Sequence, residues 1–485
     1  MEQTFLWHDY ETFGINAPAD RPAQFAAIRT DASLNEIGEP INILCQPAPD
    51  YLPDPASCLV TGITPQHCLQ HGLAEQAFAA RIHAALSQAG TIGVGYNSIR
   101  FDDEFTRFLF WRNLIDPYGR EWQDGCGRWD LLDVMRLAHA LRPDDIHWPQ
   151  HENGTTSFRL EHLSAANGLQ HDSAHDALSD VRATLALARL LKTVQPKLFD
   201  FALALHKKDR VAQELGLPVT QHQAQPFLHV SGMLPALHGF MAVMWPLASH
   251  PVNRNEIIAW DLRHDPQELA DLSATEIRQR LFTKSDDLPE GVRRLPIKGI
   301  HLNRSPMVVR NLHVLTHQQA QRWQIDLDQA RHHAETARGL PDMSAIWSEV
   351  FARPKTAAAD IDIDVDGDLY AGFVSVADRR RLETLRQLSG EQLADARTGF
   401  EDARLEELFW RYRARNFPDT LSEEERSRWR EHCVARLLDG QGGARTLDDL
   451  LAALDALHPG ADTCGLAVLD ALQDYAQHIV PEFSG

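Results

Sequence analysis

Short apolar runs alternate with amphipathic stretches along the first 192 residues, a pattern typical of a central sheet covered by helices. The apolar runs predict strands at Phe5–Glu11, Gln24–Arg29, Ile37–Cys45 and Thr91–Tyr96. The amphipathic stretches predict helices around Phe78–Leu86 and at Glu104–Arg112, Leu131–Leu141, Phe158–Asn167 and Ala177–Leu191. We therefore expect an α/β domain with a mixed sheet and flanking helices over residues 1–195.

The pattern changes at Pro196. Short β-like runs broken by Gly, Pro and Asn follow at Phe227–Val230, Ile257–Leu262, Ile297–Leu302 and Met307–Leu312. From Asp378 onward the apolar positions recur at helical spacing. A chain of 485 residues also exceeds one compact core. We predict a β-rich α+β domain over residues 196–352 and a helical C-terminal domain over residues 353–485.

The composition is that of a water-soluble folded protein, with 44% hydrophobic and 24% charged residues. No apolar run approaches the ~18 residues that a membrane span requires, and the first residues lack the pattern of a secretory signal. The six cysteines are scattered without zinc-ligand spacing. We expect a cytoplasmic protein that is not associated with a membrane.

The net charge of −21 argues at first against a nucleic-acid partner. However, residues 201–310 carry roughly 13 basic and 11 acidic side chains, so this middle part is close to neutral while its flanks are strongly acidic. Total charge is a better guide to solubility than to partners. A partner that carries phosphate groups therefore stays possible.

Asp9 and Glu11 are candidate metal ligands. They lie two residues apart on a predicted strand, so both side chains point to the same face. Adjacent carboxylates repel each other unless a cation lies between them, which favours a magnesium or manganese site. Most Asp-x-Glu pairs are simply solvated, so this pair alone is weak support.

Two further acids and a histidine have both a structural and a functional interpretation. Asp102 opens a predicted helix directly after a strand, where it either caps that helix or delivers a third carboxylate to the edge of the sheet. Asp180 lies one turn into the helix that begins near Ala177, and His175 precedes that helix. Each of the last two is an ordinary surface residue when it is taken alone.

The order of these segments is far more specific than any one of them. An Asp-x-Glu pair on a first strand, an Asp at a strand-to-helix junction and a His-x4-Asp pair on a helix resemble the DEDD superfamily of 3′–5′ exonucleases, in its histidine subclass. The segment Val60–Pro65 is similar to the substrate-facing loop of that superfamily.

Longer blocks throughout the chain resemble the bacterial exodeoxyribonuclease I family. These blocks are His8–Gly14, Asp20–Asp31, Arg128–Arg136, Ser157–Leu163, His229–Met233 and Tyr412–Pro418. The resemblance implies a ribonuclease H-like exonuclease domain, an SH3-like DNA-binding domain and a helical C-terminal domain. It also implies processive 3′ to 5′ degradation of single-stranded DNA to 5′-mononucleotides, in DNA repair and recombination.

The resemblance implies a two-metal-ion mechanism. Asp9, Glu11, Asp102 and Asp180 would hold two Mg²⁺ ions, for which Mn²⁺ is expected to substitute. His175 would accept a proton from the attacking water, and Glu11 would also meet the terminal 3′-hydroxyl.

The same resemblance assigns further residues to the DNA. Arg159 is expected to contact substrate, although a surface helix arginine is the simpler interpretation from the residue alone. The remaining positions expected along the strand, each equally consistent with an ordinary surface residue, are Arg107, Tyr118, Trp122, Arg136, Arg142, Lys208, Asn255, Lys298 and Asn303. Phe13 and Phe101 either stack on bases or pack in the core, and core packing is favoured.

The implied protein partner is single-stranded DNA-binding protein, through its acidic C-terminal tail, with Arg142 as a candidate contact. A monomer is expected. Three alternatives stay open: an RNA exonuclease of the same superfamily, a catalytically silent strand-binding protein, and a proofreading subunit of a polymerase. The two long domains after residue 196 argue against the first, and the complete set of acids argues against the second.

Overall fold

The computed structural model describes residues 3–170, 176–218, 223–352 and 363–479. They form two compact units. The first unit contains the described parts of Met1–Gly127, His171–Leu185 and Asp360–Gly485, and the second contains those of Arg128–Gln170 and Ala186–Ala359. Each unit is described by itself, and the division into three domains stays a prediction.

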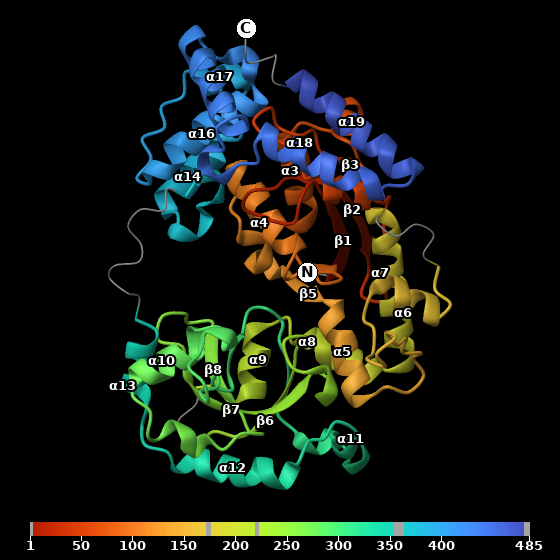
Figure 1. Cartoon of the computed structure of the whole chain (residues 1–485), viewed down its shortest axis with the longest axis vertical. Helices are drawn as coiled ribbons and strands as arrows, with labels where there is room; N and C mark the ends of the chain where they lie inside the picture. The colour runs from red at the N-terminus through yellow and green to blue at the C-terminus, as the bar shows by residue number, and fades with distance from the viewer. Residues whose placement is uncertain (1–2, 171–175, 219–222, 353–362, 480–485) are drawn as a thin grey trace. The chain divides into compact units, whose positions relative to one another are not determined.

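A mixed sheet lies at the centre of the first unit (Figure 1). Its strands are β1 (Thr4–Thr12), β2 (Pro22–Thr30), β3 (Ile41–Leu44) and β4 (Thr91–Gly95). The sheet has the order β3-β2-β1-β4-β5, and its edge strand β5 (Gly127–Asp130) begins at Gly127, where the unit's first segment ends. β1 is antiparallel to β2 and parallel to β4. The central position of β1 is what places its acids at the functional site described below.

The two faces of this sheet follow from the alternation of side chains along β1 and β2. Leu6 and Tyr10 point to one face, where they pack with Phe78 and Ile82 of α3 (Glu75–Leu86) and with Leu109 of α4 (Asp102–Arg112). The opposite face carries the intervening residues of β1, including its two acids. On that face the two acids follow the buried aromatic residues Phe5 and Trp7, so the apolar first half of β1 packs on both sides of the sheet and only its last part carries polar groups.

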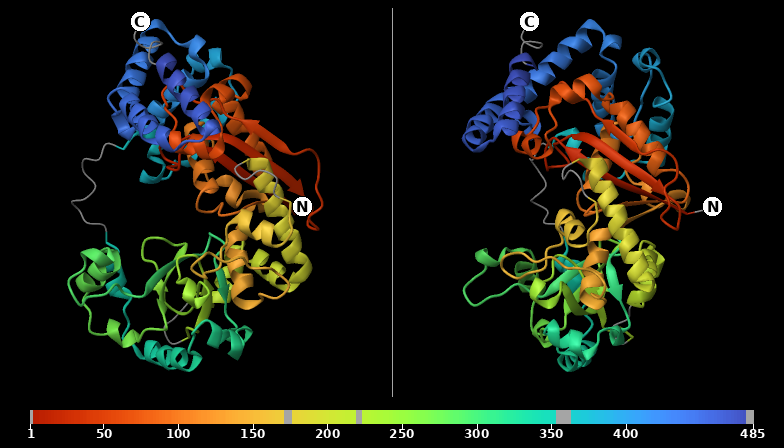
Figure 2. Two further views of the ribbon diagram at one scale, coloured as in Figure 1. Left: turned by 45° about the vertical axis from the view of Figure 1, so that its right-hand side comes forward. Right: turned by 90° about the vertical axis from the view of Figure 1, so that its right-hand side faces the viewer.

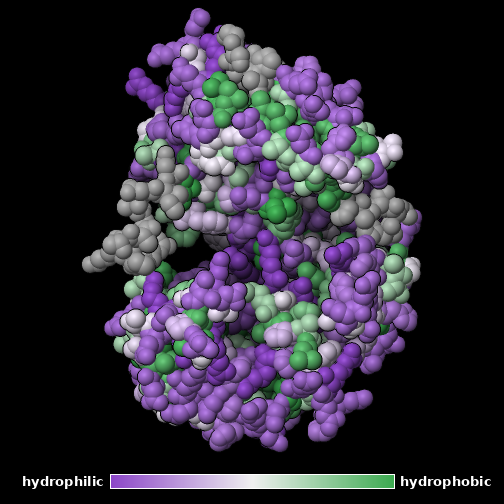
Figure 3. All heavy atoms as spheres, in the orientation of Figure 1, coloured by the Kyte–Doolittle hydropathy of each residue, from purple (hydrophilic) through white to green (hydrophobic). Residues whose placement is uncertain are grey.

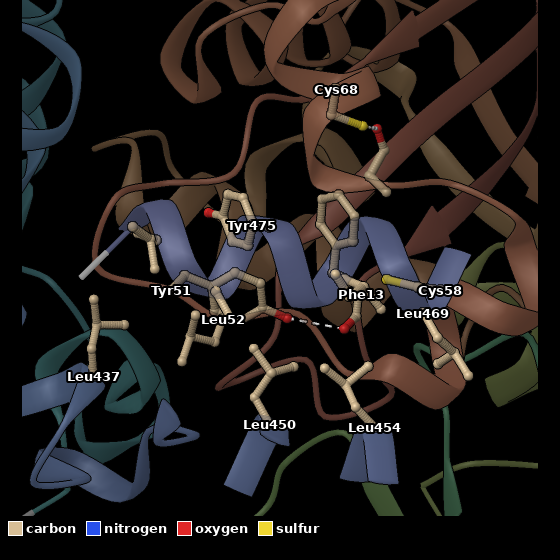
Figure 4. Close-up of a cluster of buried hydrophobic side chains, with 14 residues drawn as sticks. Phe13, Tyr51, Leu52, Cys58, Cys68, Leu437, Leu450, Leu454, Leu469 and Tyr475 are labelled. Carbon is tan, nitrogen blue, oxygen red and sulfur yellow. Dashed lines mark hydrogen bonds between the residues drawn. The ribbon is translucent and has the colours of Figure 1, made fainter. Parts of the chain in front are cut away.

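A second cluster of buried hydrophobic side chains packs an early segment of the chain, residues 13–68, against a late segment, residues 437–479 (Figure 4). Phe13 and Cys68 pack there with leucines of α18 (Leu447–Leu457) and α19 (Thr463–Ile479), so Phe13 is a core residue, as the sequence favoured. The Tyr51 hydroxyl oxygen lies 3.1 Å from the Phe13 carbonyl oxygen. Figures 1 and 2 show these two C-terminal helices beside the early segment that contains α1 (Pro55–Thr61), followed by α2 (Pro65–His71).

A buried ion network also fastens the C-terminal part of the first unit. Arg415 lies 2.6 Å from Asp50 and 2.5 Å from Asp366, and Arg21 lies 2.9 Å from Asp366, with all four side chains at most 2% exposed. Arg415 belongs to α16, and the C-terminal helices before α18 are α14 (Val376–Leu385), α15 (Gly390–Ala394), α16 (Ala403–Asn416) and α17 (Glu423–Leu437). Burial alone would raise the pKa of Asp50, but the Arg415 guanidinium holds that pKa well below its usual range.

The second unit is built on an antiparallel sheet with the order β10-β6-β7-β8-β9. Its strands are β6 (Phe227–Val230), β7 (Met241–Ser249), β8 (Glu256–Asp261), β9 (Ile297–His301) and β10 (Met307–Val309). The helices are α5 (Leu131–Leu141), α6 (Leu160–Ala166), α8 (Pro196–Ala204), α9 (Lys208–Leu215), α10 (Ala274–Phe282), α11 (His317–Arg322), α12 (Leu327–Gly339) and α13 (Ser344–Val350). Trp245 of β7 and Trp260 of β8 are opposite each other and fully buried.

The predicted fold class is confirmed: a mixed sheet with flanking helices, a β-rich part and a helical C-terminal part. β7 is absent from the predicted strands because Pro246 interrupts its pattern, and the structure has a register shift between Pro246 and Ala248. The predicted strand Ile37–Cys45 is shorter, at Ile41–Leu44. Hydrophilic side chains cover most of the face in Figure 3. Among the helices described, none has the length and apolar character to cross a bilayer.

Candidate active site

β1 presents two carboxylates on one face of the central sheet. Asp9 and Glu11 alternate with inward-packed Tyr10, and their cross-strand neighbours in β2 are Ala26 and Gln24. The first half of β1 is largely apolar and buried, and it anchors the strand in the core. Both predicted acids therefore face the same side, as the sequence spacing requires.

The turn after β1 is tightly built around Asp20. Its carboxylate accepts hydrogen bonds from the Asn16 backbone N–H at 2.8 Å and from the Tyr51 hydroxyl at 2.9 Å. A Cβ atom at Gly14 would lie 2.1 Å from this carboxyl group, so only glycine fits beside it. This turn fixes the end of β1 just beyond Glu11.

Asp102 reaches the same region from α4. This helix follows β4, which runs parallel to β1, so the carboxyl ends of both strands meet at one edge of the sheet. Asp102 is buried, and its Oδ1 accepts a hydrogen bond from the Tyr10 backbone N–H at 3.1 Å. Thr106 Oγ1 lies 2.8 Å from the Asp102 carbonyl and 3.0 Å from the Tyr10 hydroxyl. Asp102 is thereby tied directly to β1, the strand that carries Asp9 and Glu11.

Asp180 completes the group from the first turn of α7 (Ala177–Val194). Oxygen atoms of Asp9, Glu11 and Asp180 all lie within 4.8 Å of one another. Asp102 is outside this closest trio, although its charge acts on Asp9. His175, the predicted proton acceptor, lies outside the described residues.

The raised pKa values of Asp9 and Glu11 favour a bound cation at this site. Burial and the charges of Asp102, Glu11, Asp180 and Asp176 raise the pKa of Asp9 well above its usual range. Burial and the charges of Asp180 and Asp176 raise the pKa of Glu11 to about 8. A divalent ion between the carboxylates would offset both the burial and the repulsion. The donor set, carboxylate oxygens at short mutual distance, fits such an ion.

Gln24 and Asp176 are site residues that the sequence patterns did not reveal. Gln24 Nε2 donates to Asp176 Oδ1 at 3.2 Å, and Asp176 adds its charge to the acidic group. Both line a cavity of about 560 Å³ together with Gly62 and Ile63 of the predicted substrate-facing loop. A polar glutamine within the apolar run Ala23–Ile28 was the signal that could have identified Gln24.

Three residues predicted to contact DNA lie in the first unit. Arg107 is buried, with its guanidinium 2.8 Å from Glu121 and 2.6 Å from Glu104. Tyr118 is half-buried, and the Arg107 guanidinium lies 5.4 Å from its ring centre. Trp122 is 64% exposed. Trp122 is therefore open to a base, whereas Arg107 is already engaged by carboxylates.

Three more lie in helical parts of the second unit. Arg136 pairs with Asp133 at 2.6 Å, and Arg142 donates to the Val314 carbonyl at 3.2 Å. Arg159 immediately precedes α6, and its side chain is 66% exposed and 3.8 Å from Glu161. Arg159 thus has a largely solvated guanidinium, as a phosphate contact requires.

The remaining four lie around the second sheet. Lys208 Nζ donates to Asn255 Oδ1 at 2.6 Å, so two predicted contacts touch each other just before β8. Lys298 is a half-buried residue of β9, and Asn303 is exposed shortly after that strand. Lys208 of α9 and Asn255 thus lie beside the start of β8, while Lys298 lies on β9, the strand paired with β8, and Asn303 follows β9. Contact of these residues with DNA stays a prediction.

Comparisons with known proteins agree with this geometry. Three family profiles match: "Exonuclease" at residues 6–188, "Exonuclease I SH3-like domain" at 206–353 and "Exonuclease I C-terminal domain" at 363–479. Exodeoxyribonuclease I of Escherichia coli is 42% identical over 484 residues, covering 99% of both chains.

Two solved structures are also closely similar. E. coli exonuclease I in complex with a dA16 oligonucleotide is 42% identical with a TM-score of 0.89, and an ExoI/SSB-Ct complex is 41% identical with a TM-score of 0.90. Each alignment covers 99% of this chain and 100% of the other. The SH3-like class predicted for the middle domain is confirmed by its family profile.

The carboxylate group, the mixed sheet that carries it and the three family matches lead to one assignment. Exonucleases of this type require a divalent metal, for which the grouped acids are suitable ligands. The chain belongs to the exodeoxyribonuclease I family and is a hydrolase with 3′–5′ exonuclease activity on DNA.

Proposed function

We propose that this chain degrades single-stranded DNA from its 3′ end and releases 5′-mononucleotides, using two Mg²⁺ ions held by Asp9, Glu11, Asp102 and Asp180. The observation that carries the proposal is the convergence of Asp9, Glu11 and Asp180 to within 4.8 Å from separate segments of the chain. The solved relative with a bound dA16 strand supports the choice of substrate.

The choice of magnesium follows from the ligand chemistry. Carboxylate oxygens suit hard cations, whereas zinc prefers nitrogen and sulfur ligands. Mn²⁺ shares the preference for oxygen and is expected to substitute. Bound metal ions would activate water and stabilise charge on the attacking and leaving oxygens of the phosphodiester.

The protein groups have distinct roles in this proposal. β1 is paired with β2 at Asp9 and Glu11, and its first half, Thr4–Trp7, is also paired with β4, so the sheet holds the backbone of both acids. The bond from the Tyr10 N–H fixes the orientation of the Asp102 carboxylate. Glu11 would accept a hydrogen bond from the terminal 3′-hydroxyl, and His175 would accept a proton from the attacking water.

The strand would be held by positive and aromatic side chains. Arg159 and Trp122 are both exposed and suit a phosphate and a base, respectively. The other proposed contacts are Arg107, Tyr118, Arg136, Arg142, Lys208, Asn255, Lys298 and Asn303. A set of contacts this large would hold a strand over several nucleotides, which favours processive digestion.

The proposal extends to partners and setting. By analogy with the solved ExoI/SSB-Ct complex, the chain would bind the acidic C-terminal tail of single-stranded DNA-binding protein. We also propose that it is a monomer and acts in DNA repair and recombination. The six cysteines are free thiols, which suits a reducing cytoplasm.

Digestion of end-labelled oligonucleotides tests the reaction. With Mg²⁺, a 3′-labelled single strand should lose its label as mononucleotide at once, whereas a 5′ label should be released last. A matched RNA strand and a blunt DNA duplex should be cut far more slowly. First release of the 5′ label would refute the polarity, and equal cutting of RNA would favour the alternative RNA exonuclease.

The variant Asp180→Asn tests the metal assignment. It should abolish hydrolysis while leaving affinity for single-stranded DNA in place, because one metal ligand is lost and the strand contacts are kept. Unchanged turnover would refute the proposed ligand set.

A further inference from the structure

Gln24 occupies a position beside the acidic group that none of the roles above explains. It lies in β2 directly across from Glu11, so the two side chains share a face of the sheet. Gln24 is only 7% exposed, and a buried amide normally has its hydrogen-bonding groups satisfied.

The amide of Gln24 makes three hydrogen bonds. Nε2 donates to Asn42 Oδ1 of β3 at 2.9 Å and to Asp176 Oδ1 at 3.2 Å. Oε1 accepts from the Ala177 backbone N–H at 3.4 Å. Ala177 is the first residue of α7, whose first N–H groups have no partner within the helix. Both ends of the amide are therefore used, one by a side-chain acid and one by the helix terminus.

Asp176 in turn holds the first turn of α7. Its Oδ2 accepts from the Ser179 N–H at 3.2 Å, and its carbonyl accepts from the Asp180 N–H at 3.0 Å. Asp176 thus acts as a helix cap. The chain of contacts runs from Gln24 through Asp176 to the backbone of Asp180, the ligand that α7 contributes.

We propose that Gln24 is a positioning residue that holds the start of α7 against the sheet, so that Asp180 stays within reach of Asp9 and Glu11. This inference rests on the proposed function, since that function requires Asp180 to be a metal ligand. An amide is required because Asp176 needs a donor while the Ala177 N–H needs an acceptor. A carboxylate at position 24 would repel Asp176, and an apolar side chain would satisfy neither group.

Three substitutions separate these requirements. Gln24→Met keeps the size of the side chain and removes all its hydrogen bonds, Gln24→Glu keeps the acceptor but adds a negative charge, and Gln24→Asn keeps a shorter amide. The matched control is Gln46→Met, because Gln46 is a half-buried glutamine whose amide donates only to the Leu69 carbonyl among the bonds described.

The measurements are kcat, KM for a single-stranded DNA oligonucleotide, and the Mg²⁺ concentration that gives half-maximal activity. Residues that orient metal ligands typically affect metal affinity or activity by about 10- to 100-fold. We expect Gln24→Met and Gln24→Glu to raise the Mg²⁺ requirement and lower kcat to that extent, with KM within about twofold of wild type. Gln24→Asn should be milder, and Gln46→Met should match wild type.

Wild-type kcat and Mg²⁺ requirement in Gln24→Met would overturn the inference, because that variant has none of the hydrogen bonds of the Gln24 amide. A change in KM alone would also overturn it, because that result assigns Gln24 to DNA binding. If Gln24→Met does not fold, the Mg²⁺ requirements of Gln24→Asn and Gln24→Glu are compared. A higher requirement in Gln24→Glu supports the positioning role, and equal requirements refute it. Asp180→Asn distinguishes failure of the proposed function from failure of the positioning role. Activity in Asp180→Asn refutes the proposed function itself. An inactive Asp180→Asn together with a normal Gln24→Met refutes only the role of Gln24.

Discussion

Neutralising Glu11 should raise the free energy of unfolding of the metal-free protein and abolish the further stabilisation by Mg²⁺. Burial and the charges of Asp180 and Asp176 raise the pKa of Glu11 from 4.5 to about 8. The folded state therefore opposes ionisation of this group, and the penalty grows as the pH rises from 4.5 to about 8, above which it is constant. The variant Glu11→Gln removes that penalty, because its amide carries no charge.

The size of the effect follows from the two pKa values. A tenfold change in a proton-binding constant corresponds to about 1.4 kcal/mol, so the penalty is about 2 kcal/mol at pH 6 and about 5 kcal/mol at pH 9. Urea unfolding in EDTA at these two pH values should give a free energy of unfolding that is higher for Glu11→Gln than for wild type by these amounts. Adding Mg²⁺ at pH 9 should stabilise wild type and leave the variant nearly unchanged, since a bound ligand stabilises only the state that binds it.

Glu39→Gln is the matched control, because Glu39 is an exposed glutamate in the loop before β3. It should unfold like wild type at both pH values, with and without Mg²⁺. Equal or lower stability of Glu11→Gln at pH 9 in EDTA would show that ionisation of the Glu11 carboxylate costs the folded state nothing, and the argument for a cation at this site would fail.

Other parts of the molecule give sharper local tests. Gly14→Ala should lower the free energy of unfolding by about 1–3 kcal/mol and reduce kcat, because its Cβ would lie 2.1 Å from the Asp20 carboxyl group; unchanged urea unfolding would contradict this. Asp50→Asn should cost about 3–5 kcal/mol at pH 7 by leaving buried Arg415 poorly compensated. Because the pKa of Asp50 is lowered, that loss should shrink as the pH falls below 3.8, and a loss independent of acidification would argue against the ion pair. Arg159→Ala should reduce the slope of log affinity for single-stranded DNA against log salt by about 0.7, and an unchanged slope would exclude a phosphate contact.

The sequence was sufficient for the acids whose placement depends on local periodicity. Asp9 and Glu11 share a face because strand side chains alternate, and Asp102 lies at the junction where β4 gives way to α4. Asp180 required the family resemblance, since nothing in the periodicity of a helix shows which strand it will face. These positions are the part of the site that pattern and order along the chain can specify.

Partners across long sequence distances could not be predicted. The resemblance assigns Arg107 to DNA, but in the structure it pairs with Glu121, fourteen residues away in the short 3-10 helix Gly119–Glu121. The pattern around Gln24 indicates only a strand, because its partners, Asn42 and Asp176, lie 18 and 152 residues away. In both cases the pairing depends on tertiary packing, which propensity and spacing do not contain.

The buried ion network has a consequence for how the protein is made. Asp50, in the loop between β3 and α1, and Arg415 are separated by 365 residues, so the buried aspartate leaves the ribosome long before the arginine that neutralises it has been synthesised. At about 5–20 residues per second, that delay is roughly 20–70 s. During that delay the Asp50 carboxylate lacks the guanidinium that compensates it in the folded protein, so the segment around Asp50 reaches its final buried packing only after Arg415 has been synthesised.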